Sequence, residues 1–273
     1  MSFDFDYHVH TKLSYCSEGE LTVDALRQQA RARGLKGFAI TDHTAHLYFD
    51  GKAAWQYPYI TDFTRFSDLL ETRRPNFEGY LAMLAQQKAA NDGPAILTGT
   101  ETDVAANGQL VFDTRYRRQL DIFLGGIHWL PCLKNRQTGP VFIQQFLDFT
   151  LMLLEHDIDI LAHPTRVFRR LKLDVPRDVV DPIVRKARDK GIAIEINSHT
   201  QCDPDSHFVK RCLDEGVKLA LGTDTHHIRE IGDFTHHRAL LASLGITESQ
   251  LDGILFRHNG IPNREPRTVN PEP

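Results

Sequence analysis

The sequence contains no apolar run that approaches the roughly 20 residues of a membrane-spanning helix. Its first ten residues, MSFDFDYHVH, lack the basic and apolar regions of a secretory signal. Cysteine is scarce, and the absence of C-x-x-C spacing argues against a structural zinc knuckle and a disulfide framework. The four cysteines are Cys16, Cys132, Cys202 and Cys212. We therefore expect a cytoplasmic protein with reduced cysteines and no membrane contact.

Neither sign of charge dominates the chain. It has 32 Lys and Arg against 36 Asp and Glu, a formal net charge of −4 over 273 residues. This slight acidity argues against a stable nucleic-acid partner and an anionic membrane surface. The apolar fraction of 41% and the charged fraction of 25% are those of an ordinary globular protein, and they leave the oligomeric state open.

Short apolar runs alternate with helix-period stretches, and this alternation predicts a parallel sheet covered by helices. The seven expected strands are residues 3–10, 37–42, 95–101, 120–128, 157–163, 191–197 and 217–223. The clearest expected helices are 22–33, 77–90, 140–155, 177–190, 206–215 and 229–244. Seven such units indicate a closed or nearly closed single-domain barrel over residues 1–261, one unit short of the usual eight. Residues 262–273, with four prolines, should form an extended tail.

Local signals refine this expectation. Thr22 and Asn76 are candidate N-caps, and Asn107-Gly108 is a hairpin signal between short apolar pieces. Residues 44–75 lack periodicity but are rich in aromatic side chains, which argues for a long functional loop rather than disorder. We expect this aromatic loop to cover the mouth of the barrel.

Barrel enzymes build their sites at the carboxyl ends of the strands. All seven expected strands end in a side chain that can bind metal or transfer protons. The chain holds 14 histidines, twice the number of tyrosines, and imidazole is a common metal ligand. The strand-end residues are His8, His10, Asp42, His43, Glu101, His128, His163, Glu195, Asn197, Asp224 and His226. Potential ligands at the end of every expected strand favour a metal site over a chance arrangement of these residues.

The tripeptide His8-Val9-His10 is the sharpest local pattern. Side chains alternate along a strand, so both imidazoles face one side while the valine faces the other. Residues 224–226, Asp-Thr-His, repeat this geometry on the last strand. Two ligand atoms on one face can chelate one ion.

Several strand-end residues also have plainer explanations. His128 alone is typical of a hydrogen-bonded core histidine, and His163 of a strand-end residue. We expect Asp42 to orient a neighbouring ligand rather than to bind metal. We expect Glu195 and Asn197 to line the barrel mouth without touching metal. Candidates for substrate contact on loops at the same end are His46, His199 and His207.

The motifs together resemble those of the PHP (polymerase and histidinol phosphatase) family, in order and in spacing, over about residues 5–245. They are YHVHTKLSYCSEG, AITDH, GTE, GGIH, LAHP and LGTDTHH. The resemblance implies a distorted seven-stranded (β/α)7 TIM-like barrel, in agreement with the seven strands counted above. It also implies a stand-alone bacterial phosphoesterase with three divalent metal ions, which are zinc, manganese or iron in different members.

The resemblance implies one ligand set for the three ions. The first ion would take His8, His10, Glu101 and Asp224, the second Glu101, His128 and His163, and the third His43, His226 and Cys16. Cys16 is the one departure, because relatives carry His or Asp there. It either directs the third site towards zinc or leaves that site weak or empty. Catalytic roles are assigned to Glu101, His128 and Asp224.

Such ligands suit hydrolysis of a phosphate ester by hydroxide that the metal ions activate. Residues 163–190 hold nine Lys and Arg against four Asp, and Arg166 and Arg169 are the candidate phosphate-binding residues. The expected substrate is a small phosphorylated metabolite, with histidinol phosphate and nucleotide phosphates as options. One alternative is an amidohydrolase-type enzyme, although no lysine ends a strand here. The other is a non-catalytic, metal-stabilised PHP domain.

Overall fold

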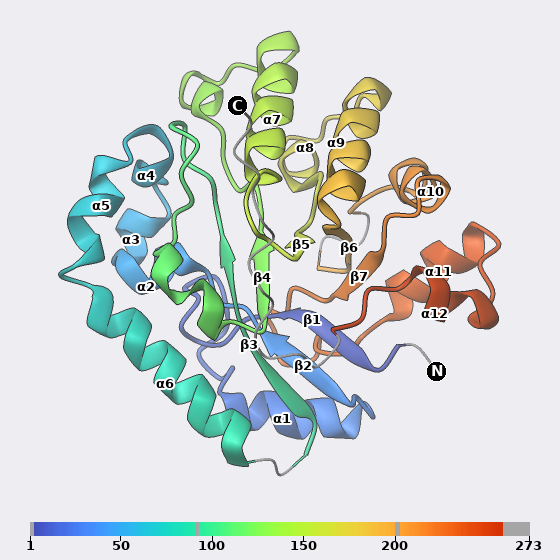
Figure 1. Cartoon of the computed structure of the whole chain (residues 1–273), viewed down its shortest axis with the longest axis horizontal. Helices are drawn as coiled ribbons and strands as arrows, with labels where there is room; N and C mark the ends of the chain where they lie inside the picture. The colour runs from blue at the N-terminus through green and yellow to red at the C-terminus, as the bar shows by residue number, and fades with distance from the viewer. Residues whose placement is uncertain (1–2, 91–92, 200–202, 259–273) are drawn as a thin grey trace, which may run out of the picture.

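The structure of the chain, a computed structural model, describes residues 3–90, 93–199 and 203–258. Seven strands form one sheet in chain order, and each pairs in parallel with the next (Figure 1). They are β1 (Phe5–Val9), β2 (Gly37–Ile40), β3 (Ala95–Thr102), β4 (Ile122–Gly125), β5 (Ile160–Leu161), β6 (Ala193–Asn197) and β7 (Leu219–Gly222). All seven expected strands are confirmed, although most are shorter than the apolar runs that predict them.

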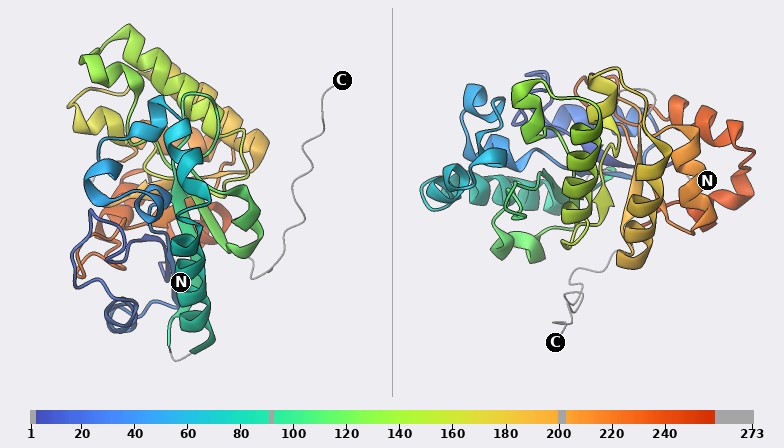
Figure 2. Two further views of the ribbon diagram at one scale, coloured as in Figure 1. Left: turned by 90° about the vertical axis from the view of Figure 1, so that its left-hand side faces the viewer. Right: turned by 90° about the horizontal axis from the view of Figure 1, so that it is seen from above.

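The first and last strands meet at a seam that nearly closes the barrel. Val9 and Thr225 form a parallel bridge there. The backbone N–H of His10 donates to the carbonyl of Thr225, and that of Thr225 donates to the carbonyl of His8, each at 3.3 Å. Seen from further sides, the helices stand around the outside of the strands (Figure 2). The single-domain, nearly closed barrel is therefore as predicted.

The longer helices cover the outside of the barrel. They are α1 (Val23–Ala32), α6 (Arg74–Ala90), α7 (Pro140–Leu153), α9 (Arg177–Lys190), α10 (Ser206–Asp214) and α11 (Thr235–Ser243), with the shorter α8 (Arg166–Arg170) and α12 (Leu251–Ile254). In α1 the residues Val23, Leu26 and Ala30 are buried, as the helical period predicts. Thr22 caps this helix, because its hydroxyl oxygen accepts a hydrogen bond from the N–H of Ala25 at 3.2 Å.

Residues 44–75 are not the long loop that we expected. They form the short helices α2 (Thr44–Tyr48), α3 (Gly51–Ala54), α4 (Pro58–Thr61) and α5 (Thr64–Leu70), which lie beside α6 (Figure 1). Helices this short carry too few turns to show a repeating period in the sequence. Several of their aromatic side chains enter the core, where the ring of Tyr48 lies 5.0 Å from Phe66 and 5.8 Å from Phe77.

Two helix starts differ from their predictions. Asn76 is not an N-cap, because Pro75 already stands in the first turn of α6 and the side-chain amide of Asn76 donates to the carbonyl of Leu47 at 3.2 Å. The last long helix begins at Thr235 rather than at residue 229. Gly232 adopts a left-handed φ of 69° just before it, which interrupts a helical backbone.

The predicted hairpin is confirmed on a small scale. Val104 and Leu110 form an antiparallel bridge, and Gly108 supplies a positive φ of 83° in the turn between them. The tail at 262–273 and Cys202 lie outside the described residues. Within the described part of the chain, no helix has the length and apolar content to cross a lipid bilayer.

The core has two parts, on the two faces of the sheet. A large cluster, which includes Phe38 and Ile40 of β2, packs between strands and helices. A smaller cluster includes Ala39 of the same strand, which the pleat turns to the opposite face, into the barrel. The buried histidines and carboxylates of the next section stand where the strands end, so the barrel presents them at one rim.

Candidate metal centre

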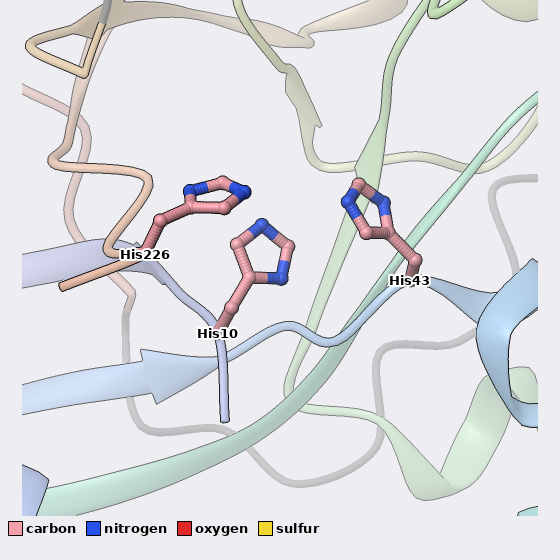
Figure 3. Close-up of side chains that lie close together, drawn as sticks. All are labelled: His10, His43 and His226. Atoms are coloured by element: carbon pink, nitrogen blue, oxygen red, sulfur yellow. The ribbon is translucent and has the colours of Figure 1, made fainter. Parts of the chain in front are cut away.

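The strand ends bring together the side chains that the sequence predicts there. Groups of three residues with ligand atoms within 4.8 Å of one another are His8–His10–Asp224, His8–Glu101–His163, His43–Glu101–His128, His10–His43–His226 and Cys16–His43–His46. The rings of His10, His43 and His226 face one another from the ends of three different strands (Figure 3). All nine predicted ligands therefore fall in one connected cluster.

The first set of ligand atoms lies at the seam between β1 and β7. The Nε2 atoms of His8 and His10 are 3.1 Å apart, and Asp224 Oδ1 is 3.0 Å from His10 Nε2 and 3.5 Å from His8 Nε2. Glu101 Oε2 is 3.3 Å from His8 Nε2. Ligand atoms about 2.1 Å from a tetrahedral ion are about 3.4 Å apart, so these four atoms fit around one cation.

Glu101 faces two sets of histidines, one with each carboxylate oxygen. Oε1 lies 2.7 Å from His163 Nε2 and 3.3 Å from His128 Nε2. Oε2 lies 2.9 Å from His43 Nδ1 and faces the first set as well. Both oxygens are buried, and neither has a hydrogen bond of acceptable geometry. Buried polar atoms are seldom left so, and a site for cations at Glu101 would satisfy them.

Hydrogen bonds to Nδ1 fix the orientation of three of these rings. Nδ1 of His8 donates to Glu195 Oε1 at 2.8 Å, and Nδ1 of His128 donates to Asp103 Oδ1 at 3.0 Å. Nδ1 of His10 donates to Ser14 Oγ at 3.0 Å, and that hydroxyl donates onward to Asp42 Oδ1 at 2.6 Å. Each bond uses the proton on Nδ1, so Nε2 is the nitrogen that faces the centre and that could bind a metal ion once it is unprotonated.

The hydrogen-bond partners of these rings can be compared with the roles that we expected from the sequence. Asp42 does not contact the ring of His10 by a direct hydrogen bond and is linked to it through Ser14. Glu195 is more than a residue of the mouth, because it holds His8. Asp103 was missed, although it lies two residues after Glu101 and so shares its face of the chain.

The Cys16 region is arranged around two further histidines. Cys16 forms a group with His43 and His46, and His226 forms a group with His43 and His10. Burial raises the pKa of the Cys16 thiol to about 12, so a thiolate there needs a cation beside it. His46 thus joins a cluster to which the family motifs do not assign it.

Arginines close one side of the cavity over these residues, which has a volume of about 320 Å³. Arg166 is buried, lines the cavity and pairs with Asp224 Oδ2. Arg170 lines it too, and donates to the carbonyl of His128 at 3.2 Å. Arg169 is not among the lining residues. Of the two arginines expected from the sequence, the cavity is thus lined by Arg166, and Arg170 lines it in addition.

The charges of the centre compensate one another. Burial opposes protonation of His8, but Glu195 and Glu101 raise its pKa to about 10. Burial likewise opposes protonation of His128, but Asp103 and Glu101 raise its pKa to about 10. Burial would raise the pKa of Glu101, yet the surrounding imidazoles hold it well below its usual range. Protons on two histidines thus balance the buried carboxylates, a charge that a bound cation would supply instead.

The backbone is adapted to this crowding. His163 and Asp224 both adopt positive φ, at 28° and 52°, a conformation that L residues with side chains rarely adopt. At Gly126 an added Cβ would lie 2.7 Å from Glu101 Oε1 and 2.8 Å from His163 Cε1. Only glycine therefore leaves room for both side chains at the end of β4.

Comparisons with known proteins agree with this arrangement. A curated relative from Acetivibrio thermocellus, named a probable phosphatase, is 27% identical over 249 residues, covering 88% of this chain and 87% of the relative. The DNA polymerase/3'-5' exonuclease PolX of Bacillus subtilis is 25% identical over 232 residues, covering 84% of this chain but 35% of the relative. The histidinol phosphate phosphatase of Lactococcus lactis, solved with zinc, L-histidinol and phosphate, has the same fold. Its TM-score is 0.61 at 18% identity, covering 89% of this chain and 94% of that one.

The model of the PHP domain family matches residues 6–199, which is most of the chain. That range contains the first six strand ends, and the residues after β7 add Asp224 and His226. On this match, the chain belongs to the PHP domain family.

Proposed function

We propose that this protein is a metal-dependent phosphatase that hydrolyses a small phosphate monoester. The observation that carries the proposal is Glu101, whose two buried and unsatisfied oxygens face two separate sets of histidines. Centres with two or more ions a few ångströms apart are common in enzymes that hydrolyse phosphate esters. Relatives named as probable phosphatases support the same chemistry.

Three ions are the proposed complement. The first would be held by His8, His10, Glu101 and Asp224, the second by Glu101, His128 and His163, and the third by His43, His226 and Cys16. Bound divalent ions would polarise the phosphoryl oxygens and lower the pKa of water at the site. We propose zinc for the third position, because a thiolate prefers zinc to the harder manganese.

The chain's own residues bind and orient the ester. Arg166 and Arg170 bring two guanidinium groups to the cavity, and guanidinium binds phosphate through paired hydrogen bonds. Trp55, Tyr57 and Tyr59 add aromatic surface to the lining of the same cavity. A planar substituent such as an imidazole or a nucleobase would pack there, so histidinol phosphate and nucleotide phosphates remain the proposed substrates.

The test is a panel of phosphate esters offered to the metal-loaded protein, with the chelated protein as control. The panel contains p-nitrophenyl phosphate, histidinol phosphate and nucleotide 3'- and 5'-phosphates. We expect release of inorganic phosphate that depends on metal, with one of the natural esters preferred over p-nitrophenyl phosphate. Full metal occupancy without hydrolysis of any ester would contradict the proposal and favour a non-catalytic domain.

A further inference from the structure

His46 is a buried histidine beside the metal centre that no motif of the family explains. It lies in α2, directly after the ligand candidate His43, and its ring is 4.6 Å from that of His43. On its other side the ring of Trp55 lies 5.6 Å away, and Trp55 is 47% exposed. His46 and Trp55 both line the cavity over the centre. His46 thus occupies the border between the ligands and the open mouth.

The hydrogen bond that His46 makes sets it apart from the ligand histidines. The backbone N–H of Tyr15 donates to His46 Nδ1 at 3.0 Å, so Nδ1 carries a lone pair and the ring proton is on Nε2. In His8, His128 and His226 the roles are reversed. There Nδ1 donates to Glu195, to Asp103 and to the carbonyl of Asp224, which leaves Nε2 free to bind metal.

This difference decides between two roles for His46. Its position within 4.8 Å of ligand atoms of Cys16 and His43 would allow a metal site. A metal ion at Nε2 would, however, have to displace the proton that the bond from Tyr15 places there. The geometry instead makes His46 a hydrogen-bond donor at the cavity.

The position of His46 indicates which oxygen would accept that hydrogen bond. A phosphoryl group held at the metal centre has its substituent directed outwards, past the aromatic residues of the mouth. The ester bond that breaks therefore crosses the border where His46 stands, between His43 and Trp55.

We propose that His46 donates its Nε2–H to the ester oxygen that leaves phosphorus. The oxygen of a water molecule forms a new bond to phosphorus while the P–O bond to the leaving group breaks. The electron pair of that bond goes to the departing oxygen, and the hydrogen bond from His46 stabilises the developing charge. His46 keeps its proton, and the proton that the attacking water releases ends, through solvent, on the departing alcohol. This inference rests on the proposed function and adds a residue that acts on the leaving group.

Three variants test it: His46→Leu removes the donor, His46→Gln keeps an N–H near the same place, and His156→Gln is the matched control, because His156 contacts the carbonyl of Gly108 and does not line the cavity. The substrates are an alkyl phosphate, whose alcohol is a poor leaving group, and p-nitrophenyl phosphate, whose phenol leaves readily. We expect His46→Leu to lower kcat on the alkyl ester about 10²–10³-fold, as removal of an oxyanion donor does, and on the aryl ester less than about tenfold. His46→Gln should restore part of the alkyl activity at unchanged zinc content.

Other outcomes overturn the inference. If His46→Leu lowered kcat equally on the two esters, the hydrogen bond of His46 would be to a phosphoryl oxygen that does not leave. If His46→Leu lost bound zinc, His46 would be a metal ligand. Histidine ¹⁵N NMR of the wild type reads the tautomer without any turnover, and an Nδ1–H form of His46 would also contradict it. A wild type that hydrolyses neither ester, by contrast, contradicts the proposed function itself.

Discussion

Glu195 accepts a hydrogen bond from His8 Nδ1 at 2.8 Å and so directs the other ring nitrogen of His8 towards Glu101 and Asp224. The second oxygen of Glu195 accepts from the N–H of His163 at 2.6 Å and from the side-chain amide of Asn197 at 3.1 Å. One carboxylate thus receives donors from three strand ends. A glutamine at position 195 would point its own side-chain N–H at one of these donors and could not accept a hydrogen bond from it.

We therefore expect Glu195→Gln to weaken zinc binding about 10–100-fold, the usual effect of removing a group that orients a metal-bound histidine. Zinc competition with a chromogenic chelator measures this. Glu155→Gln, at an exposed carboxylate that pairs with Lys186 and Lys190, is the control and should bind zinc as the wild type does. Unchanged affinity in Glu195→Gln would show that the bond to His8 does not support metal binding.

Cys16 provides a second prediction, on the identity of the third metal. If its thiolate binds zinc, Cys16→Ala should contain roughly one zinc ion per chain fewer than the wild type, and Cys16→His should regain it with a nitrogen ligand. Elemental analysis after dialysis gives both numbers. Identical metal contents in wild type and Cys16→Ala would rule out a ligand role for this cysteine.

Arg169 and Arg170 of α8 make a matched pair for testing the phosphate-binding surface. Arg170→Ala should raise the Kd for inorganic phosphate on the zinc-loaded protein about tenfold or more, because a charged hydrogen bond contributes about 1.5–3 kcal/mol. Arg169→Ala should change it little, since Arg169 does not line the cavity. Calorimetric titration with phosphate compares the variants. A larger loss of affinity in Arg169→Ala than in Arg170→Ala would instead favour Arg169, as expected from the sequence, as the phosphate-binding residue.

We expect the buried carboxyl group of Asp203 to make the stability of the folded protein depend on pH. Its buried carboxylate accepts from the N–H and the hydroxyl of Thr165 at 2.8 Å, and burial raises its pKa from 3.8 to about 6. The folded protein thus binds this proton more tightly than the unfolded chain does. The stabilisation that comes from this tighter proton binding is fully present below about pH 4 and is lost as the pH rises through about 6.

The unfolding free energy of the wild type relative to Asp203→Asn should therefore fall by up to about 3 kcal/mol between pH 4 and 6, and then stay level. Denaturant titrations with chelator in both samples measure the difference, and titrating groups common to both proteins cancel. A difference that rises with pH over this window would mean that the native carboxyl is ionised more easily than in the unfolded chain.

The fold could be predicted because parallel strands buried on both faces appear as continuous apolar runs. The runs that contain β2, β6 and β7 are of this kind, and each is followed by polar side chains at the rim. The helices α2 to α5 could not be predicted in the same way. Tertiary packing of aromatic rings such as Tyr48 and Phe66 holds them, and this leaves no local period.

The clustering of the candidate ligands could be predicted for a related reason, since the fold places one strand end after another at the same rim. Which other residues line the cavity beside these candidate ligands depends on the direction in which each side chain leaves its helix. In a helix Arg170 is about 40° and Arg169 about 60° out of phase with Arg166, so a small rotation decides which one reaches the cavity. The bond from the Tyr15 backbone to His46 joins segments 31 positions apart, and no pattern in the sequence marks it.

Zinc titration of the metal-free protein, with hydrolysis of p-nitrophenyl phosphate followed at each step, tests the multi-ion centre around Glu101. We expect almost no activity up to about one equivalent and a steep rise as further ions bind, because two ions share the Glu101 carboxylate. Glu101→Gln should stay inactive at every zinc concentration. Full activity in the chelated protein, or at one equivalent of zinc, would contradict a centre that works through more than one ion.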